Sequence, residues 1–81
     1  MDTRKEVSLR IQQLCAAHGH SINALARKSG IPPTTVKNII YGNSRNPGIV
    51  TIKLICDGLD ISLCEFFDSD AFKKFDLEDI G

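Results

Sequence analysis

Apolar residues recur along this chain at the spacing of amphipathic helices, and no alternating run is long enough to predict a strand. In the first segment, Val7, Ile11, Leu14 and Cys15 fall on one helical face, and Gly19 follows where a helix end is expected. The first predicted helix therefore spans about Thr3 to Ala17, and the pattern favours an all-α fold.

Two short helices are predicted next, joined through a single glycine. Ser21 suits the N-cap of the second helix because its hydroxyl can accept a backbone N–H, and Gly30 ends this helix. The third helix begins near Pro33, since proline is favoured at the first helical position, and runs to Tyr41. The apolar positions of these two helices are Ile22, Leu25, Ala26, Val36, Ile39 and Ile40.

The rest of the chain predicts two more helices and a tail. Residues 43–48 form a polar loop rich in turn formers, and a fourth helix covers about Ile49 to Gly58. A fifth short helix starts at Ser62, and the apolar pattern weakens after Asp68. We therefore expect one domain over residues 1–68 and a short acidic tail over 69–81, which is either a sixth short helix or a frayed end.

The spacing around the second and third helices predicts a helix-turn-helix. Ala26 is small enough to let the two helices cross closely, and Gly30 can adopt the positive φ of a tight turn. With the apolar residues of the third helix turned inward, its outer face presents Thr34, Lys37 and Asn38.

In these features residues 7–67 resemble the phage-repressor/Cro-like (XRE) helix-turn-helix family. The resemblance rests on Arg10-Ile11, Ser21, Leu25-Ala26, Gly30-Ile31, Val36, Ile39, Gly42, Arg45-Asn46-Pro47, Leu59-Asp60-Ile61-Ser62 and Phe66-Phe67. It implies a compact five-helix, repressor-like domain that binds double-stranded DNA, usually as a homodimer, and regulates transcription.

The resemblance also implies which residues meet DNA. The third helix would lie in the major groove, with Lys37 donating to guanine and Asn38 pairing with adenine. Two positions depart from the family, because Ile22 and Pro33 stand where glutamine is frequent. The expected DNA-binding residues are Ser21, Pro33, Thr34, Thr35, Lys37, Asn38, Asn43, Ser44 and Arg45.

The distribution of charge supports a polyanionic partner although the formal net charge is zero. No Asp or Glu occurs from Val7 to Cys56, a stretch that contains six Lys and Arg residues. Residues 65–81 instead hold six acidic and two basic residues. A basic body with an acidic end can meet a polyanion on one face.

Other candidate chemistry is weak in this sequence. Cys15, His18 and His20 provide three ligand types but no nearby fourth, so we expect no metal site and a core position for Cys15. No catalytic motif, cofactor motif, signal peptide or membrane-spanning run is visible, which predicts a cytoplasmic protein that is not an enzyme.

A candidate dimer interface follows from apolar residues outside the core stripes. Val50 and Leu54 lie off the main apolar face of the fourth helix, and Leu63 and Phe67 lie nearby in sequence. They are either an ordinary apolar surface or a self-complementary patch for a two-fold dimer that binds a pseudo-palindromic operator.

The function expected from the sequence is therefore sequence-specific binding of double-stranded DNA by a small, repressor-like transcriptional regulator. The alternative is a protein-interaction module, such as an antitoxin or an anti-repressor, that uses the C-terminal tail to contact a protein partner.

Overall fold

The computed structural model describes residues 3–42 and 47–73, and this part of the chain contains helices and no strand. The helices are α1 (Thr3–His18), α2 (Ile22–Ser29), α3 (Pro33–Ile40), α4 (Ile49–Leu59) and α5 (Leu63–Phe66). A further helical turn begins at Asp70 and continues to Lys73, the last described residue. The predicted all-α fold is confirmed. No helix in the described ranges combines the length and apolar character needed to cross a membrane.

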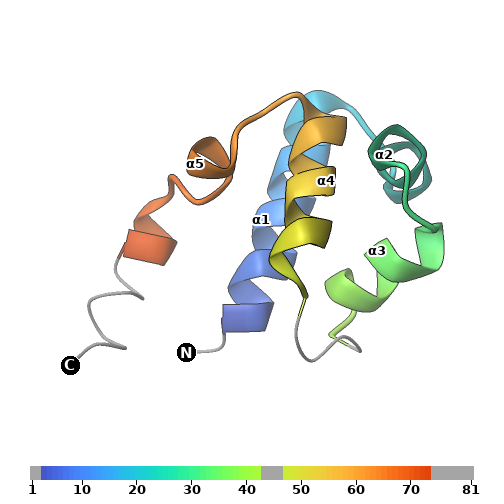
Figure 1. The fold of residues 1–81 in the computed structure, drawn as a ribbon. Coiled ribbons are helices and arrows are strands. Elements are labelled where there is room, and N and C mark those ends of the chain that lie inside the picture. The colour runs from blue at the N-terminus through green and yellow to red at the C-terminus, as the bar shows by residue number, and fades with distance from the viewer. Residues whose placement is uncertain (1–2, 43–46, 74–81) are drawn as a thin grey trace.

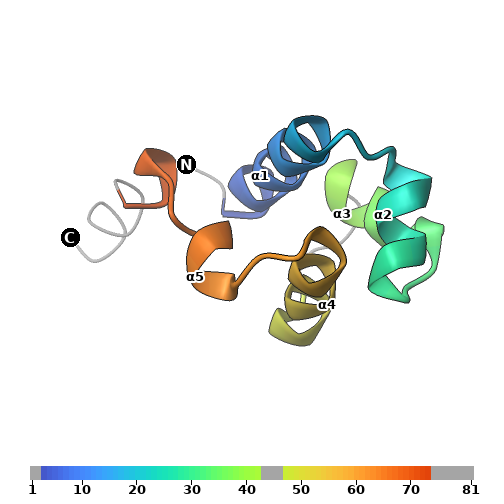
Figure 2. The ribbon, with the colours of Figure 1, turned by 90° about the horizontal axis from the view of Figure 1, so that it is seen from above.

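The helices are arranged around two that run side by side. Figure 1 shows α1 and α4 in the middle of the molecule, with α2 and α3 on one side and α5 on the other. The view from above in Figure 2 shows the same order. Helix α2 packs on α4 and α3, and α3 also packs on α1. The helix-turn-helix therefore rests on the two central helices.

The core is built from the apolar faces that the helical spacing predicts. Ile11, Leu25, Val36, Ile55 and Phe66 are completely buried, one from each of the five helices. The remaining buried apolar residues are Val7, Leu14, Cys15, Ala26, Ile39, Ile52, Cys56, Leu59 and Phe72. All five helices thus contribute to one core.

The end of α4 differs from the prediction. The sequence places it at Gly58, whereas the helix continues to Leu59 and its C-cap is Asp60, which has a left-handed φ of 59°. Gly58 lies inside the helix against α2, where an added Cβ would be 3.0 Å from the backbone nitrogen of Ser29. The glycine at this position therefore permits a close helix crossing and does not end a helix.

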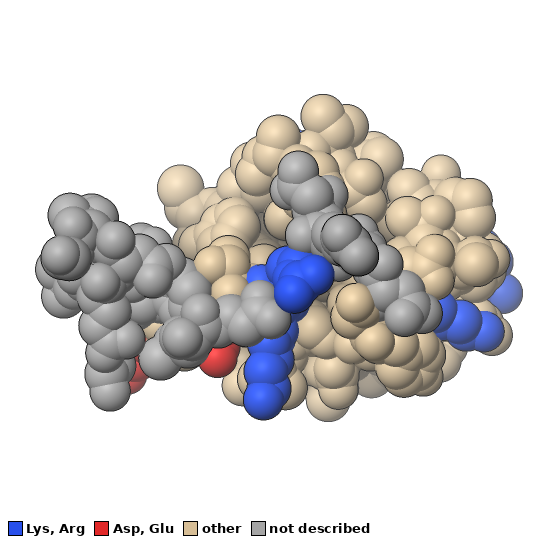
Figure 3. Space-filling model, turned by 90° about the horizontal axis from the view of Figure 1, so that it is seen from below, with Lys and Arg blue, Asp and Glu red and all other residues tan. Residues whose placement is uncertain are grey.

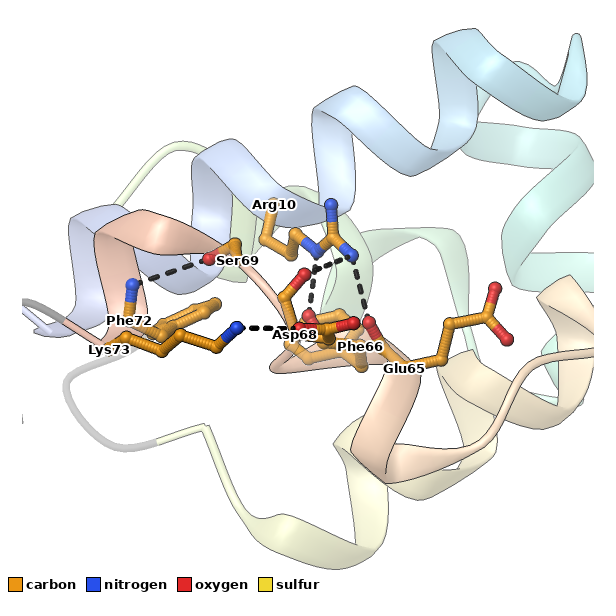
Figure 4. Close-up of polar contacts among 7 residues, drawn as sticks. All are labelled: Arg10, Glu65, Phe66, Asp68, Ser69, Phe72 and Lys73. Atoms are coloured by element: carbon orange, nitrogen blue, oxygen red, sulfur yellow. Dashed lines mark hydrogen bonds and ion pairs between the residues drawn. The ribbon is translucent and has the colours of Figure 1, made fainter.

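The core continues past Asp68. Phe72 is 7% exposed, and its ring lies 5.1 Å from that of Phe67 and 6.4 Å from that of Phe66. The hydroxyl of Ser69 accepts a hydrogen bond from the Phe72 N–H and caps the turn that carries this ring (Figure 4). Residues 74–81 lie outside the described residues, so the division of the chain into a domain and an acidic tail stays a prediction.

Arg10 joins α1 to the end of α5. Its Nε donates to the carbonyl oxygen of Phe66 at 2.6 Å, and its Nη2 donates to that of Glu65 at 2.8 Å (Figure 4). Carbonyls at a helix end lack partners within the helix, and a cation satisfies them well. Arg10 is one of the six basic residues that suggest a basic surface in the sequence. In the structure its guanidinium instead binds backbone carbonyls of α5 and so stabilises the fold.

Two of the three cysteines belong to the core, and the predicted core position of Cys15 is confirmed. Cys15 and Cys56 are buried, and Cys64 is exposed. Burial raises the pKa of the Cys15 thiol, and burial is also the main cause that raises the pKa of Cys56. Both buried thiols are therefore held in the protonated, unreactive form.

Candidate nucleic-acid interface

The turn between α2 and α3 is formed by local signals in the sequence. The Ser21 hydroxyl accepts the Ala24 N–H at 3.1 Å and caps the start of α2. Gly30 ends α2 with a φ of 70°, a left-handed conformation that glycine adopts without a Cβ clash. Pro33 then begins α3 directly after the extended Pro32. The predicted helix-turn-helix is therefore present at α2 and α3.

The outward face of α3 is free of the protein's own chain. Thr34, Lys37 and Asn38 are all exposed, while Val36 and Ile39 of the same helix are buried against the core. Pro33 is exposed at the start of the helix, and Thr35 is half-buried. The structure thus brings together on one accessible helix the five residues of α3 that the sequence proposes for DNA contact.

The other predicted contacts lie before and after this helix. Ser21 is exposed at the start of α2, and its hydroxyl can still donate its hydrogen while it accepts the Ala24 N–H. Asn43, Ser44 and Arg45 lie outside the described residues.

A partly buried hydrogen bond holds the C-terminal end of α3 against α1. The Ser8 hydroxyl donates to the carbonyl oxygen of Ile40 at 2.7 Å, and Gln12 donates to the same hydroxyl at 3.1 Å. Ser8 is buried and 32 residues away from Ile40 in the chain. This contact satisfies one terminal carbonyl and positions the exposed helix on the body of the domain.

Comparisons with known proteins agree with this geometry. Residues 11–66 match the helix-turn-helix family of the XRE type. The chain belongs to the XRE-type helix-turn-helix family. This match covers more than half of the sequence and includes all of α2, α3 and α4.

A solved structure extends this XRE-type assignment to nearly the whole chain. The crystal structure of a tyrosine-to-phenylalanine mutant of the restriction-modification controller protein C.Esp1396I is similar with a TM-score of 0.76 and 31% identity. The alignment covers 96% of this chain and 98% of that protein. A search of curated proteins gives no significant match. The family and this structural relative support a DNA-binding transcriptional regulator.

The charges of this XRE-type domain are separated across one of its faces. In the view from below in Figure 3, basic side chains lie at the centre and toward the side of α2 and α3, and acidic side chains lie toward the side of α5. The separation follows from the sequence, since α2 and α3 contain no Asp or Glu. A polyanion is attracted to the side that carries the exposed α3.

The residues predicted for a dimer interface differ in their exposure. Val50 is 71% exposed and Leu54 36%, whereas Leu63 and Phe67 are half-buried against the core. The sequence did not single out Ile49, which is 59% exposed beside Val50. The apolar surface that α4 leaves open therefore consists of Ile49, Val50 and Leu54.

The sequence also missed a groove beside α3. A cavity of about 330 Å³ lies between the first turns of α1 and the C-terminal end of α3, and its lining includes Arg4, Lys5 and Tyr41. Tyr41 is 66% exposed. Arg4 and Lys5 are far from Tyr41 in sequence, and no sequence motif links them. Only the packing of α1 on α3 brings these residues together.

The cysteine–histidine segment shows no arrangement typical of a metal site. Cys15 is buried in the core, and His18 and His20 stack with ring centroids 6.2 Å apart. Within residues 3–42 and 47–73, no group of three His, Cys, Asp or Glu side chains is placed to hold a metal ion.

Proposed function

We propose that this chain is a transcriptional regulator that reads a specific sequence in the major groove of DNA through α3, by binding and without catalysis. The observation that carries the proposal is the exposure of Thr34, Lys37 and Asn38 together on one face of that helix. Lysine suits the acceptors of guanine, asparagine suits the paired acceptor and donor of adenine, and a threonine methyl suits thymine.

Selection of bound duplexes from a random DNA pool tests this proposal directly. A recurring half-site is the expected result, and enrichment of no sequence above background would contradict specific reading. In the selected site, Lys37→Ala or Asn38→Ala should weaken binding by about 1–3 kcal/mol and relax the preference at one position.

Lys73→Ala is the matched control for Lys37→Ala. It removes the same charge from the turn after α5, on the opposite side of α1 from α3 (Figure 1), where Lys73 pairs with Asp68 at 3.2 Å. Because Lys73 is distant from α3, its loss should leave the preferred sequence unchanged. If both lysine variants behave alike, Lys37 contributes general attraction and does not read a base.

We further propose a homodimer formed through the exposed apolar surface of α4. Burying Ile49, Val50 and Leu54 against their copies removes apolar area from water in both chains. A two-fold dimer places its two α3 helices about 34 Å apart, which is one turn of DNA. The selected site should therefore contain two inverted half-sites at that spacing.

The structural relative supports a more specific role. It is named a restriction-modification controller protein, and the similarity runs along nearly the full length of both chains. We propose that this chain acts in the cytoplasm as a repressor-like regulator of restriction-modification genes. The selected half-site should then occur upstream of genes for a DNA methyltransferase or an endonuclease.

The alternative function is an antitoxin or an anti-repressor. It would be favoured if the protein purifies with a stoichiometric protein partner and shows no affinity for DNA.

A further inference from the structure

The groove between α1 and α3 adjoins the reading face of α3 and belongs to none of the sites described so far. It has a volume of about 330 Å³, and its apolar lining includes Leu9 and Ile40. Arg4, Lys5, Gln12 and Tyr41 add polar groups to the lining. Among its described lining residues, none is acidic.

The polar groups in the groove differ in what they can still bind. Ser8, inside the groove, already donates to the Ile40 carbonyl and accepts from Gln12. Lys5 and Tyr41 are both exposed to solvent. An ammonium group and a phenolic hydroxyl can both donate hydrogen bonds to an anionic oxygen.

The groove is next to the C-terminal end of the α3 face that is proposed to read the bases. Tyr41 is the C-cap of α3, and its N–H still bonds to the carbonyl of Lys37 one turn earlier. Tyr41 therefore follows Lys37 and Asn38 by four and three residues, the spacing at which side chains share one side of a helix. A duplex that lies along this face continues past the end of α3 toward the first turns of α1, where Lys5 lines the groove and Glu6 does not.

We propose that this groove binds the phosphodiester backbone of the DNA duplex whose bases α3 reads. In this arrangement Lys5 neutralises phosphate charge, and the Tyr41 hydroxyl donates to a phosphate oxygen. Such contacts fix the position of the protein on DNA and carry no sequence information. The inference rests on the proposed function, because it requires that α3 lie against a duplex.

The salt dependence of binding to the selected duplex tests the role of Lys5. Each neutralised phosphate contributes about −0.9 to the slope of log affinity against log salt concentration. Lys5→Ala should therefore reduce the magnitude of the slope by about 0.9 for each protomer and leave the preference for the selected sequence unchanged. Lys73→Ala removes an equal charge outside the groove and should leave the slope unchanged.

Tyr41→Phe provides a second measurement that does not depend on charge. It keeps the ring in the groove and removes the hydroxyl, so the affinity should fall by about fivefold, with the slope and the preferred sequence unchanged. Both substitutions are at exposed positions, and circular dichroism checks that the helices are intact.

Each outcome of these measurements has a defined meaning. Unchanged affinity of Tyr41→Phe overturns the assigned hydrogen bond from Tyr41 to a phosphate. Equal slopes for the wild type and Lys5→Ala, with specific binding intact, overturn the inference and leave the proposed function standing. Equal effects of Lys5→Ala and Lys73→Ala also overturn it, because they show that each lysine contributes only long-range electrostatic attraction to DNA. A wild type that binds no duplex specifically contradicts the proposed function, and the inference falls with it.

Discussion

Gly58 shows how a single residue determines the way two helices cross. An added Cβ would lie 3.0 Å from the Ser29 nitrogen and 3.1 Å from its Cα, and both atoms belong to the backbone of α2. A flexible side chain can turn away from such a contact, but a backbone can move only if the whole helix shifts. The packing of α2 on α4, and with it the support of the helix-turn-helix, therefore depends on a glycine at this position.

Gly58→Ala should lower the free energy of unfolding by about 1–2 kcal/mol. Alanine improves helix propensity by up to about 1 kcal/mol, but overpacking at a tight contact costs about 1–3 kcal/mol and outweighs that gain. Urea denaturation measures the difference. Gly48→Ala is the steric control, because a Cβ there meets nothing within 4 Å; Gly48 is the N-cap of α4, and the poorer cap and the lower entropy of the unfolded chain act in opposite directions, so the net change should be small. Equal stability of both variants would show that α2 yields easily.

The sequence alone could not distinguish this role of Gly58 from that of a helix end. Glycine at a helix terminus and glycine at a helix crossing are the same letter, and only the tertiary contact with Ser29 separates them. Gly30 was predicted correctly because the residues that give it its role, the end of α2 and the prolines that follow, are its own neighbours in the chain.

At the scale of helices, the same rule explains which parts of the structure were predictable. The starts of α2 and α5 follow from Ser21 and Ser62, whose hydroxyls cap the helices as local sequence signals predict. The contacts of Arg10 with α5 span more than 50 residues of sequence, and helical spacing carries no information about them. The groove beside α3 was missed for the same reason.

Arg10 should therefore contribute to stability more than a surface cation does. Arg10→Met keeps much of the aliphatic length but removes the donors to the Glu65 and Phe66 carbonyls, and we expect a loss of about 2–4 kcal/mol in chemical denaturation. Arg10→Lys should recover part of this loss. Lys53→Met is the control, since Lys53 forms an exposed ion pair with Asp57 and should contribute less than about 1 kcal/mol. A loss no larger than that of the control would mean that water replaces Arg10 at these carbonyls.

At the scale of the whole molecule, the exposed surfaces of α3 and α4 differ in their chemistry. Helix α3 presents polar and basic side chains, and α4 presents Ile49 and Val50, which are more than half exposed. The face of one helix suits a polyanion, and that of the other suits an apolar surface. The proposed function uses both surfaces at once, one for DNA and the other for a second copy of the chain.

Val50→Glu tests the division between these surfaces. A charge buried between two copies is costly, so the variant should weaken self-association at least tenfold in sedimentation equilibrium and reduce affinity for a site with two half-sites. The helical content should not change, because Val50 is 71% exposed. Ala71→Glu adds the same charge at an exposed position of the last described helical turn and should leave the association constant unchanged. Unaltered association of Val50→Glu would place the dimer contact elsewhere.

The contrast between the buried and exposed thiols has a practical consequence. A thiol-specific alkylating reagent near neutral pH should modify Cys64 at once in the native protein and reach Cys15 and Cys56 only when the core opens. Mass spectrometry would resolve these steps, and rapid triple modification would contradict the burial. A duplex that binds only the folded protein should slow the second and third modifications in proportion to its occupancy. The rate at which the two buried thiols are alkylated would then report how much of the protein is bound to DNA.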